Sequence, residues 1–337
     1  YMSMNVKGQA KQQRGRVKTG AGFVIRFQFC VSSYNSPMSS GIIFDIKRFS
    51  IHDGPGIRTT VFLKGCPLRC AWCHNPESQS RAPQIMLRPS RCIACAECVG
   101  HCPEGAIRWN GSGVFTDREL CLECGVCTAY CAAEARELIG REISAAELLA
   151  EIKRDLAFFD ESGGGVTFSG GEPLQQAQFL LPVLQGCKEM EIQTAVDTCG
   201  AASWAALDLV RPYVDLFLYD IKLLDDGRHR AATGSSNRII LDNLRRLAQA
   251  GQAVQLRLAV IPGINDDEAN LRATAEFAAA LPHLHSITLL PFHNTAQDKS
   301  GRLGLDYPAA GIRPPDEARM QQIGDLLRSY GLQVAME

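Results

Sequence analysis

Three groups of closely spaced cysteines constrain this chain more than any other feature of its sequence. Eleven of its fourteen cysteines lie between positions 66 and 131. They form one trio, Cys66, Cys70 and Cys73, and two quartets with the spacing C-x2-C-x2-C-x3-C. Such short gaps let one turn of chain surround a metal centre, and a chain of 337 residues is not a small disulfide scaffold. The sequence therefore predicts a protein built around metal sites.

The two quartets have the ferredoxin spacing of a 4Fe–4S cluster. They occur in the segments CIACAECVGHC and CLECGVCTAYC. In two-cluster ferredoxins the fourth cysteine of each run binds the other cluster. By that rule the two ligand sets are Cys92, Cys95, Cys98 and Cys131, and Cys121, Cys124, Cys127 and Cys102. Zinc is the alternative, but zinc ribbons separate two C-x2-C pairs, whereas these are two tight quartets.

Strand and helix patterns alternate about six times along the chain, which predicts parallel β/α units with right-handed crossovers. Six units are fewer than a full eight-fold barrel contains. We therefore predict an α/β fold with a partial (β/α)6 TIM-like barrel, and a doubly wound sheet is the alternative. The predicted strands span 59–65, 164–171, 192–198, 214–222, 253–263 and 286–293. The predicted helices span 144–159, 173–190, 204–213, 237–251, 267–281 and 314–331.

The quartets lie in an insert between the first strand and the first helix. We expect residues 86–137 to form a ferredoxin-like domain with two 4Fe–4S clusters, inserted into a barrel made of residues 40–85 and 138–337. Residues 1–39 are predicted to be a disordered leader. Its apolar stretch is interrupted by Arg26 and Gln28 and is followed by no signal-peptide cleavage site.

The trio leaves one iron of a four-iron cluster without a protein ligand. Catalytic metals keep an open position for substrate, whereas structural metals are fully ligated. The trio is therefore predicted to be the reactive centre and the quartets to be electron carriers. C-x3-C-x2-C with an aromatic residue before the last cysteine, here Trp72, resembles the signature of the radical S-adenosylmethionine (SAM) enzymes. A zinc site or unrelated thiols are the alternatives.

The resemblance is narrower than that superfamily. The segment SIHDGPGIRTTVFLKGCPLRCAWCHNPE (50–77) is very similar to the opening of the glycyl-radical-enzyme activating enzymes. SGGEP (169–173), DTCG, DIK and LLPFH match later segments of that family in the same order, over about residues 41 to 335. The resemblance implies an oxidoreductase that cleaves SAM reductively to methionine and a 5′-deoxyadenosyl radical. That radical abstracts hydrogen from a glycine Cα of a partner enzyme, which leaves a stable glycyl radical and 5′-deoxyadenosine.

The resemblance also assigns cofactor contacts to residues near strand ends, the face that holds the active site in parallel barrels. Glycines would let the backbone approach the ligand closely, and Glu172 would bind the amino group of SAM. Polar residues after the next two strands would surround the cofactor carboxylate and, in some members, a monovalent cation, which places that ion near Asp197. The expected contacts are Trp72, Gly170, Gly171, Glu172, Asp197, Thr198, Asp220, Lys222, Arg257 and His293. Arg257 has an alternative reading as an inward arginine paired with a core acid.

Partners follow from the same resemblance. A glycyl radical enzyme would be the protein substrate, and reduced flavodoxin or ferredoxin would be the electron donor. Asp53, Gly54, Gly56 and Arg58 are expected to bind the glycyl segment, because they lie beside the cysteine loop in the sequence. The insert would relay electrons from its two clusters to the SAM cluster, or form part of the docking surface.

Two other functions stay open at this point. One is a radical SAM maturase acting on a different residue, and the other is an electron-transfer protein. The formal net charge of −1 favours neither a nucleic-acid nor a membrane partner, and no apolar run approaches the length of a spanning helix. Oxygen-labile clusters and the lack of a credible export signal favour the reducing cytoplasm.

Overall fold

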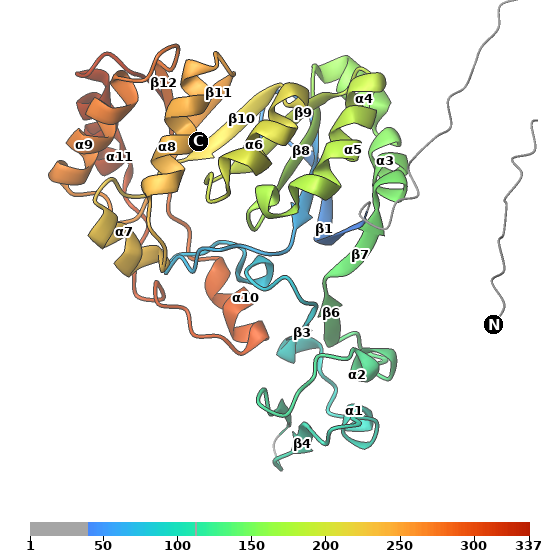
Figure 1. Ribbon diagram of the computed structural model, residues 1–337. Coiled ribbons are helices and arrows are strands. Elements are labelled where there is room, and N and C mark those ends of the chain that lie inside the picture. The colour runs from blue at the N-terminus through green and yellow to red at the C-terminus, as the bar shows by residue number, and fades with distance from the viewer. Residues whose placement is uncertain (1–39, 112) are drawn as a thin grey trace, which may run out of the picture. The chain divides into compact units, whose positions relative to one another are not determined.

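A computed structural model of the protein describes residues 40–111 and 113–337. The predicted leader, residues 1–39, lies outside the described residues. In the described part of the chain, nine strands form one sheet in the order β13-β12-β11-β10-β9-β8-β2-β1-β7 (Figure 1). Their bounds are β1 Ser40–Ser50, β2 Arg58–Leu63, β7 Arg141–Ser144, β8 Gly165–Gly170, β9 Gln193–Thr198, β10 Leu216–Asp220, β11 Val254–Val260, β12 Ser286–Pro291 and β13 Gln333–Met336.

The sheet is mostly parallel. Neighbouring strands are parallel from β2 through β8, β9, β10, β11 and β12 to β13, whereas β1 is antiparallel to both β2 and β7. The predicted α/β class is confirmed. Among the described residues the parallel strands follow one another in sequence order, without the reversal that marks the switch point of a doubly wound sheet.

Three strands of this sheet were not predicted from the sequence. β7 and β13 have four residues each and are largely exposed, so they carry little hydrophobic pattern. β1 has a half-exposed run in which charged and apolar residues alternate, and we did not recognise it as a strand. All three lie at or near the edges of the sheet, where a strand needs only one buried face.

Helices connect the parallel strands, and Figure 1 shows α3, α5 and α6 side by side against the sheet. The helix bounds are α3 Ala145–Lys153, α4 Leu156–Ser162, α5 Ala177–Glu189, α6 Trp204–Val210, α7 Asp226–Thr233, α8 Arg238–Gln249, α9 Glu268–Ala279, α10 Ala296–Leu303 and α11 Glu317–Arg328. Short 3-10 turns occur at η1 Pro76–Ser78, η3 Pro173–Gln176 and η4 Arg211–Tyr213.

Two helix predictions need correction. The single helix predicted at 144–159 is two helices, α3 and α4, although it begins with the expected capping box of Ser144 and Glu147. The break leaves Asp155 buried, where its carboxylate accepts a hydrogen bond from the Thr59 hydroxyl (2.5 Å) and pairs with Arg48. In addition, α7 and α10 were not predicted, because both are short and predominantly polar.

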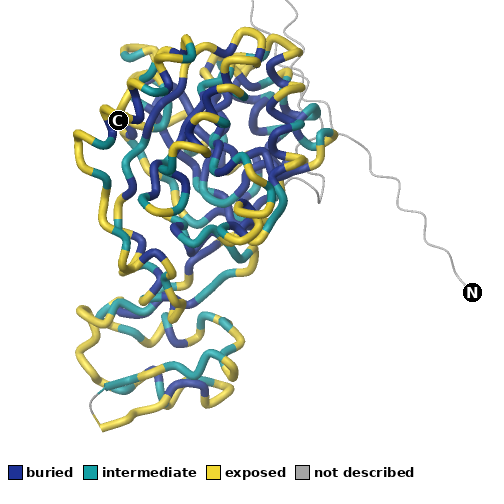
Figure 2. The backbone as a smooth tube through the Cα atoms, turned by 90° about the vertical axis from the view of Figure 1, so that its left-hand side faces the viewer, coloured by how far each residue is buried: buried dark blue, intermediate teal, exposed yellow. Residues whose placement is uncertain are grey.

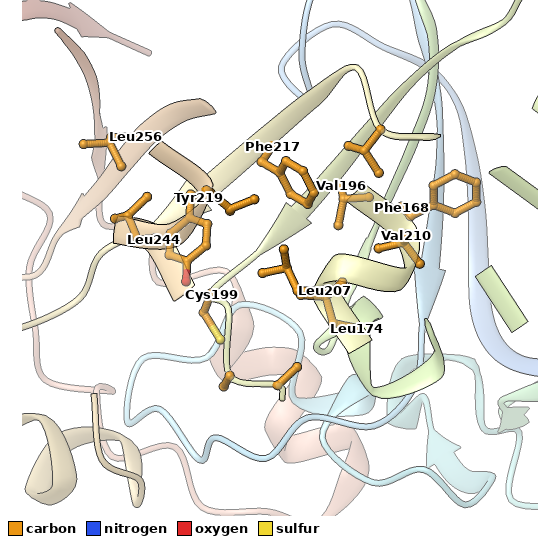
Figure 3. Close-up of a cluster of buried hydrophobic side chains, with 14 of the residues drawn as sticks. Phe168, Leu174, Val196, Cys199, Leu207, Val210, Phe217, Tyr219, Leu244 and Leu256 are labelled. Atoms are coloured by element: carbon orange, nitrogen blue, oxygen red, sulfur yellow. The ribbon is translucent and has the colours of Figure 1, made fainter. Parts of the chain in front are cut away.

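The hydrophobic core lies between the sheet and its helices. Phe168, Val196, Phe217 and Leu256 extend from adjacent strands toward a layer of helical residues (Figure 3). The helical residues in this close-up include Leu207, Val210 and Leu244. Because successive side chains of a strand point to opposite faces, the residues between these apolar ones must occupy the other face of the sheet.

The other face of the sheet is polar. Thr167, Ser169, Asp197, Asp220 and Arg257 alternate with the apolar core residues along β8 to β11. Parallel sheets are normally covered and apolar on both faces. A polar face that bears charged groups is therefore the place to look for a functional site.

The segment between β2 and α3 forms a small unit with little core of its own. Two hairpin-like pairs, β3 (Gln84–Leu87) with β6 (Arg136–Ile139) and β4 (Ile107–Trp109) with β5 (Val114–Thr116), frame α1 (Glu97–Gly100) and α2 (Val126–Ala129). Figure 2 shows mostly exposed or half-buried backbone here. Two of the four buried residues in its main apolar cluster are cysteines, Cys98 and Cys127. Units with so small a core are commonly stabilised by bound metal.

Candidate functional site

The predicted site residues lie where the parallel strands end. Cys66 follows β2, Glu172 follows β8, Thr198 and Asp220 end β9 and β10, and His293 follows β12. The carboxyl ends of parallel strands meet at one edge of a sheet, which is the edge that carries active sites in such folds. The fold therefore brings residues from segments far apart in the sequence to a common edge.

The cysteine loop at this edge is held by main-chain hydrogen bonds. The Cys66 amide donates to the Gln79 carbonyl (3.2 Å), and the Cys73 amide donates to the Cys70 carbonyl (3.0 Å). Between these two cysteines, the Ala71 amide donates a hydrogen bond to the Ala232 carbonyl near the end of α7 (2.9 Å). The positions of the three thiols are thus fixed by the chain on both sides of the loop.

The three cysteines are half-buried and affect one another's pKa values. Burial raises the pKa of the Cys66 thiol to about 12, and Glu172 and the other two thiols add to this rise. Burial likewise raises the pKa of Cys70 to about 11, against the opposing charge of Lys222, and raises that of Cys73. A thiol must lose its proton to bind a metal, so metal binding here releases protons.

Glu172 is completely buried beside the trio and accepts four hydrogen bonds. Oε1 accepts from the Leu174 amide (3.1 Å) and the Thr198 hydroxyl (2.7 Å), and Oε2 accepts from the Cys199 amide and thiol, both at 3.1 Å. Burial raises the pKa of this carboxyl, and the hydrogen bonds oppose that rise. Four donors fill the usual lone-pair sites of a carboxylate. A further donor would therefore replace one of them, and the Cys199 thiol is the weakest.

The glycines before Glu172 are required by the chain itself. Gly170 has a φ of +109°, and a Cβ there would lie 2.4 Å from the Leu63 carbonyl oxygen. A Cβ on Gly171 would lie 2.4 Å from the Gly65 oxygen. These glycines let β8 approach the start of the cysteine loop, and their contact with a ligand stays a prediction.

Asp197, Asp220, Lys222 and Arg257 form one ionic network on the polar face, in which Arg257 is buried and the other three are half-buried. Arg257 pairs with Asp197 and, through Nε, with Asp220 (3.0 Å), and the Lys222 ammonium lies 3.4 Å from Asp220. Ser169 donates a hydrogen bond to Asp197 (2.6 Å). Arg257 thus pairs with acids, as one of our two interpretations held.

The charges within this network shift one another's pKa values. Burial raises the pKa of Asp197 to about 6, although Arg257 opposes the rise. Burial would also raise that of Asp220, but Arg257 and Lys222 outweigh it and lower the pKa. For Lys222, burial would lower the pKa, but Asp220 and the thiols of the cysteine loop raise it. Lys222 is therefore a cation close enough to the cysteine trio for its charge and the thiols to shift one another's pKa values.

Trp72 is part of the cysteine loop, and His293 lies near the end of that loop. Trp72 is buried in a cluster with Ile261 and Phe292. His293 follows Phe292 and is exposed. Burial lowers the pKa of His74, the residue after the last cysteine of the trio, and the charges of Lys299 and then His293 add to this lowering. Both predicted residues thus lie close to the loop, Trp72 as a packing residue.

Glu77 and Lys299 also hold this loop in place, and neither was predicted from the sequence. Glu77 is 5% exposed and pairs with Lys299 of α10 (3.0 Å), whose ammonium also donates to the Asn75 side chain (2.9 Å). Glu77 directly follows Pro76 in the CHNPE segment, and this position after a proline was an available signal. Lys299 lies in a polar helix with no comparable signal.

Arg58 of the DGPGIR segment is buried, and its contact with a partner stays a prediction. It is 1% exposed, and its guanidinium donates to the Thr167 hydroxyl (2.6 Å), the Val166 carbonyl (2.7 Å) and the Pro55 carbonyl (3.1 Å). The residue begins β2, whereas Cys66 follows the end of that strand. Proximity to the cysteine loop in the sequence therefore does not place Arg58 beside the trio.

The rest of the segment forms a loop that Arg58 supports. Gly54 packs on the Arg58 side chain, and Gly56 has a φ of +71° and packs so closely on Gly164 that a Cβ would lie 2.5 Å from its amide nitrogen. Asp53 accepts a hydrogen bond from Thr60 (2.6 Å). Its charge contributes to raising the pKa of Arg257, after Asp197 and Asp220. Asp53 is thus the member of this segment that approaches the ionic network.

The two quartets line two separate small cavities. One cavity is lined by the cysteines Cys92, Cys95, Cys98 and Cys131, and the other by Cys102, Cys121, Cys124 and Cys127. These are the two sets obtained from the rule that the fourth cysteine changes sides. The donor set of each cavity, four thiols around a common space, fits a 4Fe–4S cluster.

The backbone of the two quartet loops repeats the same unusual conformation. Ala94 and Ala96 have φ values of 57° and 60°, and at the equivalent positions Glu123 and Gly125 have values of 53° and 80°. A positive φ is uncommon for residues with a side chain and marks a backbone constrained by its surroundings. Both loops are thus bent in the same way around their cavities.

Two features are absent from the described residues, a single-ion metal site and a membrane-spanning helix. Within 40–111 and 113–337, no three His, Cys, Asp or Glu side chains are placed to hold a single metal ion. A four-iron cluster requires a different arrangement, because each thiolate binds a different iron. In the same residues, no helix has both the length and the apolar character needed to cross a bilayer.

Known proteins resemble this chain over most of its length. A family model described as a 4Fe-4S single cluster domain matches residues 52–240. The trans-4-hydroxy-L-proline dehydratase activating enzyme of Clostridioides difficile is 40% identical, over 86% of this chain and 96% of that protein. The isethionate sulfite-lyase activating enzyme of Oleidesulfovibrio alaskensis is 44% identical, over 84% and 93%. The choline trimethylamine-lyase activating enzyme of the same organism is 37% identical, over 88% and 97%.

A solved structure of the same kind covers about half of the chain. A domain of the pyruvate-formate lyase-activating enzyme from Bacteroides vulgatus is 36% identical to this chain and has a TM-score of 0.45. The match covers 52% of this chain and 99% of that domain.

Proposed function

The chain belongs to the radical SAM activating enzymes of glycyl radical enzymes, and we propose that the cysteine trio at the polar edge of its sheet is where it cleaves SAM. The observation that carries this proposal is that Cys66, Cys70 and Cys73 lie beside a buried carboxylate, Glu172, and a half-buried ammonium, Lys222. Three thiols with opposite charges beside them suit a cluster with one open iron and a zwitterionic ligand.

When bound, the cluster supplies one electron to SAM, which yields methionine and a 5′-deoxyadenosyl radical that takes a hydrogen atom from a glycine Cα of the partner, leaving a glycyl radical and 5′-deoxyadenosine. The chain's own residues prepare this chemistry by holding groups in place. Cys66, Cys70 and Cys73 would ligate three irons.

Glu172 would bind the amino group of SAM in place of its weakest present donor, the Cys199 thiol. Thr198 would orient Glu172, since its hydroxyl donates to Oε1 (2.7 Å). Lys222 carries the positive charge that the SAM carboxylate requires, and Asp197 would accept a monovalent cation. We assign cofactor contacts to Gly170, Gly171, Asp220, Arg257, Trp72 and His293 as well.

The partner would approach the polar face of the sheet. A glycyl radical enzyme must bring a main-chain segment to the radical, and Asp53 would bind that segment. The support is that the charge of Asp53 acts on Arg257 of the ionic network. Gly54, Gly56 and Arg58 would shape the loop that carries Asp53. The relatives of this chain activate lyases and dehydratases with different substrates, so the proposal names the class of partner alone.

Residues 86–137 would form a ferredoxin-like domain with two 4Fe–4S clusters, which makes three clusters in all. The support is the pair of cavities, each lined by four cysteines in the ferredoxin combination. Residues 40–85 and 138–337 would form a partial barrel, since their parallel strands follow one another in a single direction. The insert would pass electrons from reduced flavodoxin or ferredoxin to the trio, or dock a partner. Oxygen-labile clusters favour a reducing cytoplasm.

The test is an iron and turnover measurement on anaerobically reconstituted full-length protein. Three clusters predict about twelve irons per chain. SAM should be cleaved to 5′-deoxyadenosine with dithionite present, and a glycyl radical should appear on a partner by electron paramagnetic resonance (EPR). Cys70→Ala should lower the content to about eight irons and abolish cleavage. Its matched control, Cys187→Ala, removes a buried thiol outside the three groups and should do neither.

Each outcome separates one part of the proposal from the others. About four irons with normal cleavage would remove the two insert clusters and leave the SAM site intact. Cleavage that survives Cys70→Ala would refute the trio as the reactive centre. Cleavage without any glycyl radical on candidate partners would favour a maturase that acts on another residue.

A further inference from the structure

Arg136 is a buried cation between the two cysteine quartets. It is the first residue of β6, and 4% of its surface is exposed. It borders the cavity that contains Cys98 and also the cavity that contains Cys127. Among the described residues, it is the one residue common to both linings. A change of charge in either cavity therefore acts on the same guanidinium.

This guanidinium lacks the partners that the other buried arginines have. Nη1 donates to the Thr116 hydroxyl (2.8 Å), whereas Nη2 is buried and finds no hydrogen-bond partner in the described part of the chain. The adjacent acid, Glu137, pairs with Arg88 instead (2.7 Å). By contrast, Arg257 contacts two carboxylates.

A buried charge is unfavourable unless an opposite charge and hydrogen bonds compensate it. The cavities supply that compensation when the thiols are thiolates. Cys98 and Cys127, one thiol of each quartet, are both buried in the cavities that Arg136 borders. Eight thiolates around two clusters are a concentrated negative charge, which suits the unpaired Nη2 group.

Reduction adds one negative charge to a cluster that four thiolates already make anionic. The potential of such a cluster depends on its net charge, on hydrogen bonds to its sulfurs and on its exposure to solvent. A cation nearby stabilises the reduced form, and the effect is strong where water is excluded. Arg136 meets these conditions for both cavities.

We propose that Arg136 is the shared counter-charge of the two clusters of the insert and that it raises the reduction potential of both. The inference rests on the proposed pair of clusters. In this arrangement the insert accepts an electron from its donor more readily, and reducing one cluster makes it harder to reduce the other, because both draw on the same cation.

The experiment uses the full-length chain with Cys66→Ala, Cys70→Ala and Cys73→Ala, so that the insert clusters alone are titrated. Iron and sulfide are counted, and the midpoint potentials are read from EPR spectra during a redox titration. Arg136→Met and Arg136→Gln should make both clusters at least tenfold harder to reduce, a decrease of 59 mV for a one-electron couple. Arg136→Lys keeps the charge and should retain most of the potential. Arg88 borders neither cavity, so Arg88→Met should leave the midpoint potentials unchanged.

The outcomes distinguish this inference from the proposal beneath it. Met and Gln variants of Arg136 with full iron content and unchanged potentials would overturn it. If those two variants fail to bind clusters while the Lys variant binds them, the charge itself is required and the inference is supported. If the Lys variant also fails, the residue acts through its shape, and the counter-charge role is refuted. A parent chain with far fewer than about eight irons would refute the pair of clusters itself, and this inference with it.

Discussion

Replacing Arg58 with methionine is expected to destabilise the protein and to loosen the loop that carries Asp53. Arg58 is 1% exposed and donates to the Thr167 hydroxyl at 2.6 Å and the Val166 carbonyl at 2.7 Å. It also donates to the Pro55 carbonyl (3.1 Å), which ties the DGPGIR loop to the sheet. The substitution therefore separates a structural role of this segment from direct contact with a partner.

The expected loss is a difference between two opposing effects. Two buried hydrogen bonds from a charged donor contribute about 3–6 kcal/mol together. Burial lowers the pKa of Arg58 to about 10, and at about 1.4 kcal/mol per tenfold change in ionisation the lowering corresponds to about 3 kcal/mol against the buried charge. Methionine removes both effects but leaves the Val166 carbonyl without this donor. A net loss of about 1–3 kcal/mol in the free energy of unfolding follows.

The assay is chemical denaturation of the metal-free protein, with the midpoint compared at an unchanged slope. Arg154→Met is the matched control, because Arg154 is exposed and pairs with Glu151 on the surface, and its loss should cost less than about 0.5 kcal/mol. An Arg58→Met protein that unfolds at the wild-type midpoint would refute the structural role.

Arg58→Met should also lower the radical yield on the partner more than it lowers SAM cleavage without the partner. Asp53→Ala should lower that yield and should cost about 1 kcal/mol of stability, because it removes the acceptor of the Thr60 hydroxyl. An unchanged yield would remove Asp53 from the partner site.

Three further predictions concern the edge of the sheet. Gly171→Ala should abolish SAM binding, because its Cβ would lie 2.4 Å from a backbone oxygen. The control is Gly163→Ala, which has open space around it at a helix end. It should cost only about 1 kcal/mol of stability and leave SAM binding unchanged. Glu77→Gln removes the ion pair with Lys299 and should speed loss of iron from the trio, measured as the rate of bleaching by a chelator, and an unchanged rate would show that this pair does not hold the loop. Burial raises the pKa of Asp197 to about 6, so any effect of monovalent cations on SAM affinity should weaken as pH falls through that value, while Asp197→Asn should remove the cation effect at every pH.

Much of the site could be predicted because its signals are local. The ligand sets of the quartets follow from spacings of two and three residues, and the structure groups Cys131 with the first cavity and Cys102 with the second, as those spacings predict. The six predicted strands are present because each carries an apolar run bounded by turn residues. Short polar elements such as α10 lack such a pattern, and Lys299 was missed with it.

Contacts between distant segments were beyond the reach of these local signals. Arg58 bonds to Thr167, 109 positions away, and this contact makes Arg58 a core residue, although its neighbourhood in the sequence predicts a partner site. Gly171 is needed because β8 approaches the cysteine loop, which the motif alone does not reveal. The same holds for the ionic network of Asp197 and Arg257, which lie 60 positions apart.

The sequence alone thus established which chemistry this chain carries, since ligand identity and spacing are properties of neighbouring residues. It also established the alternation of strands and helices, because hydrophobic periodicity is read over a dozen residues. Only the tertiary structure decided which charges are compensated. Arg257 meets two acids while Nη2 of Arg136 meets no acceptor among the described residues, and that difference arises from packing segments far apart in the chain around spaces that a spacing rule does not describe.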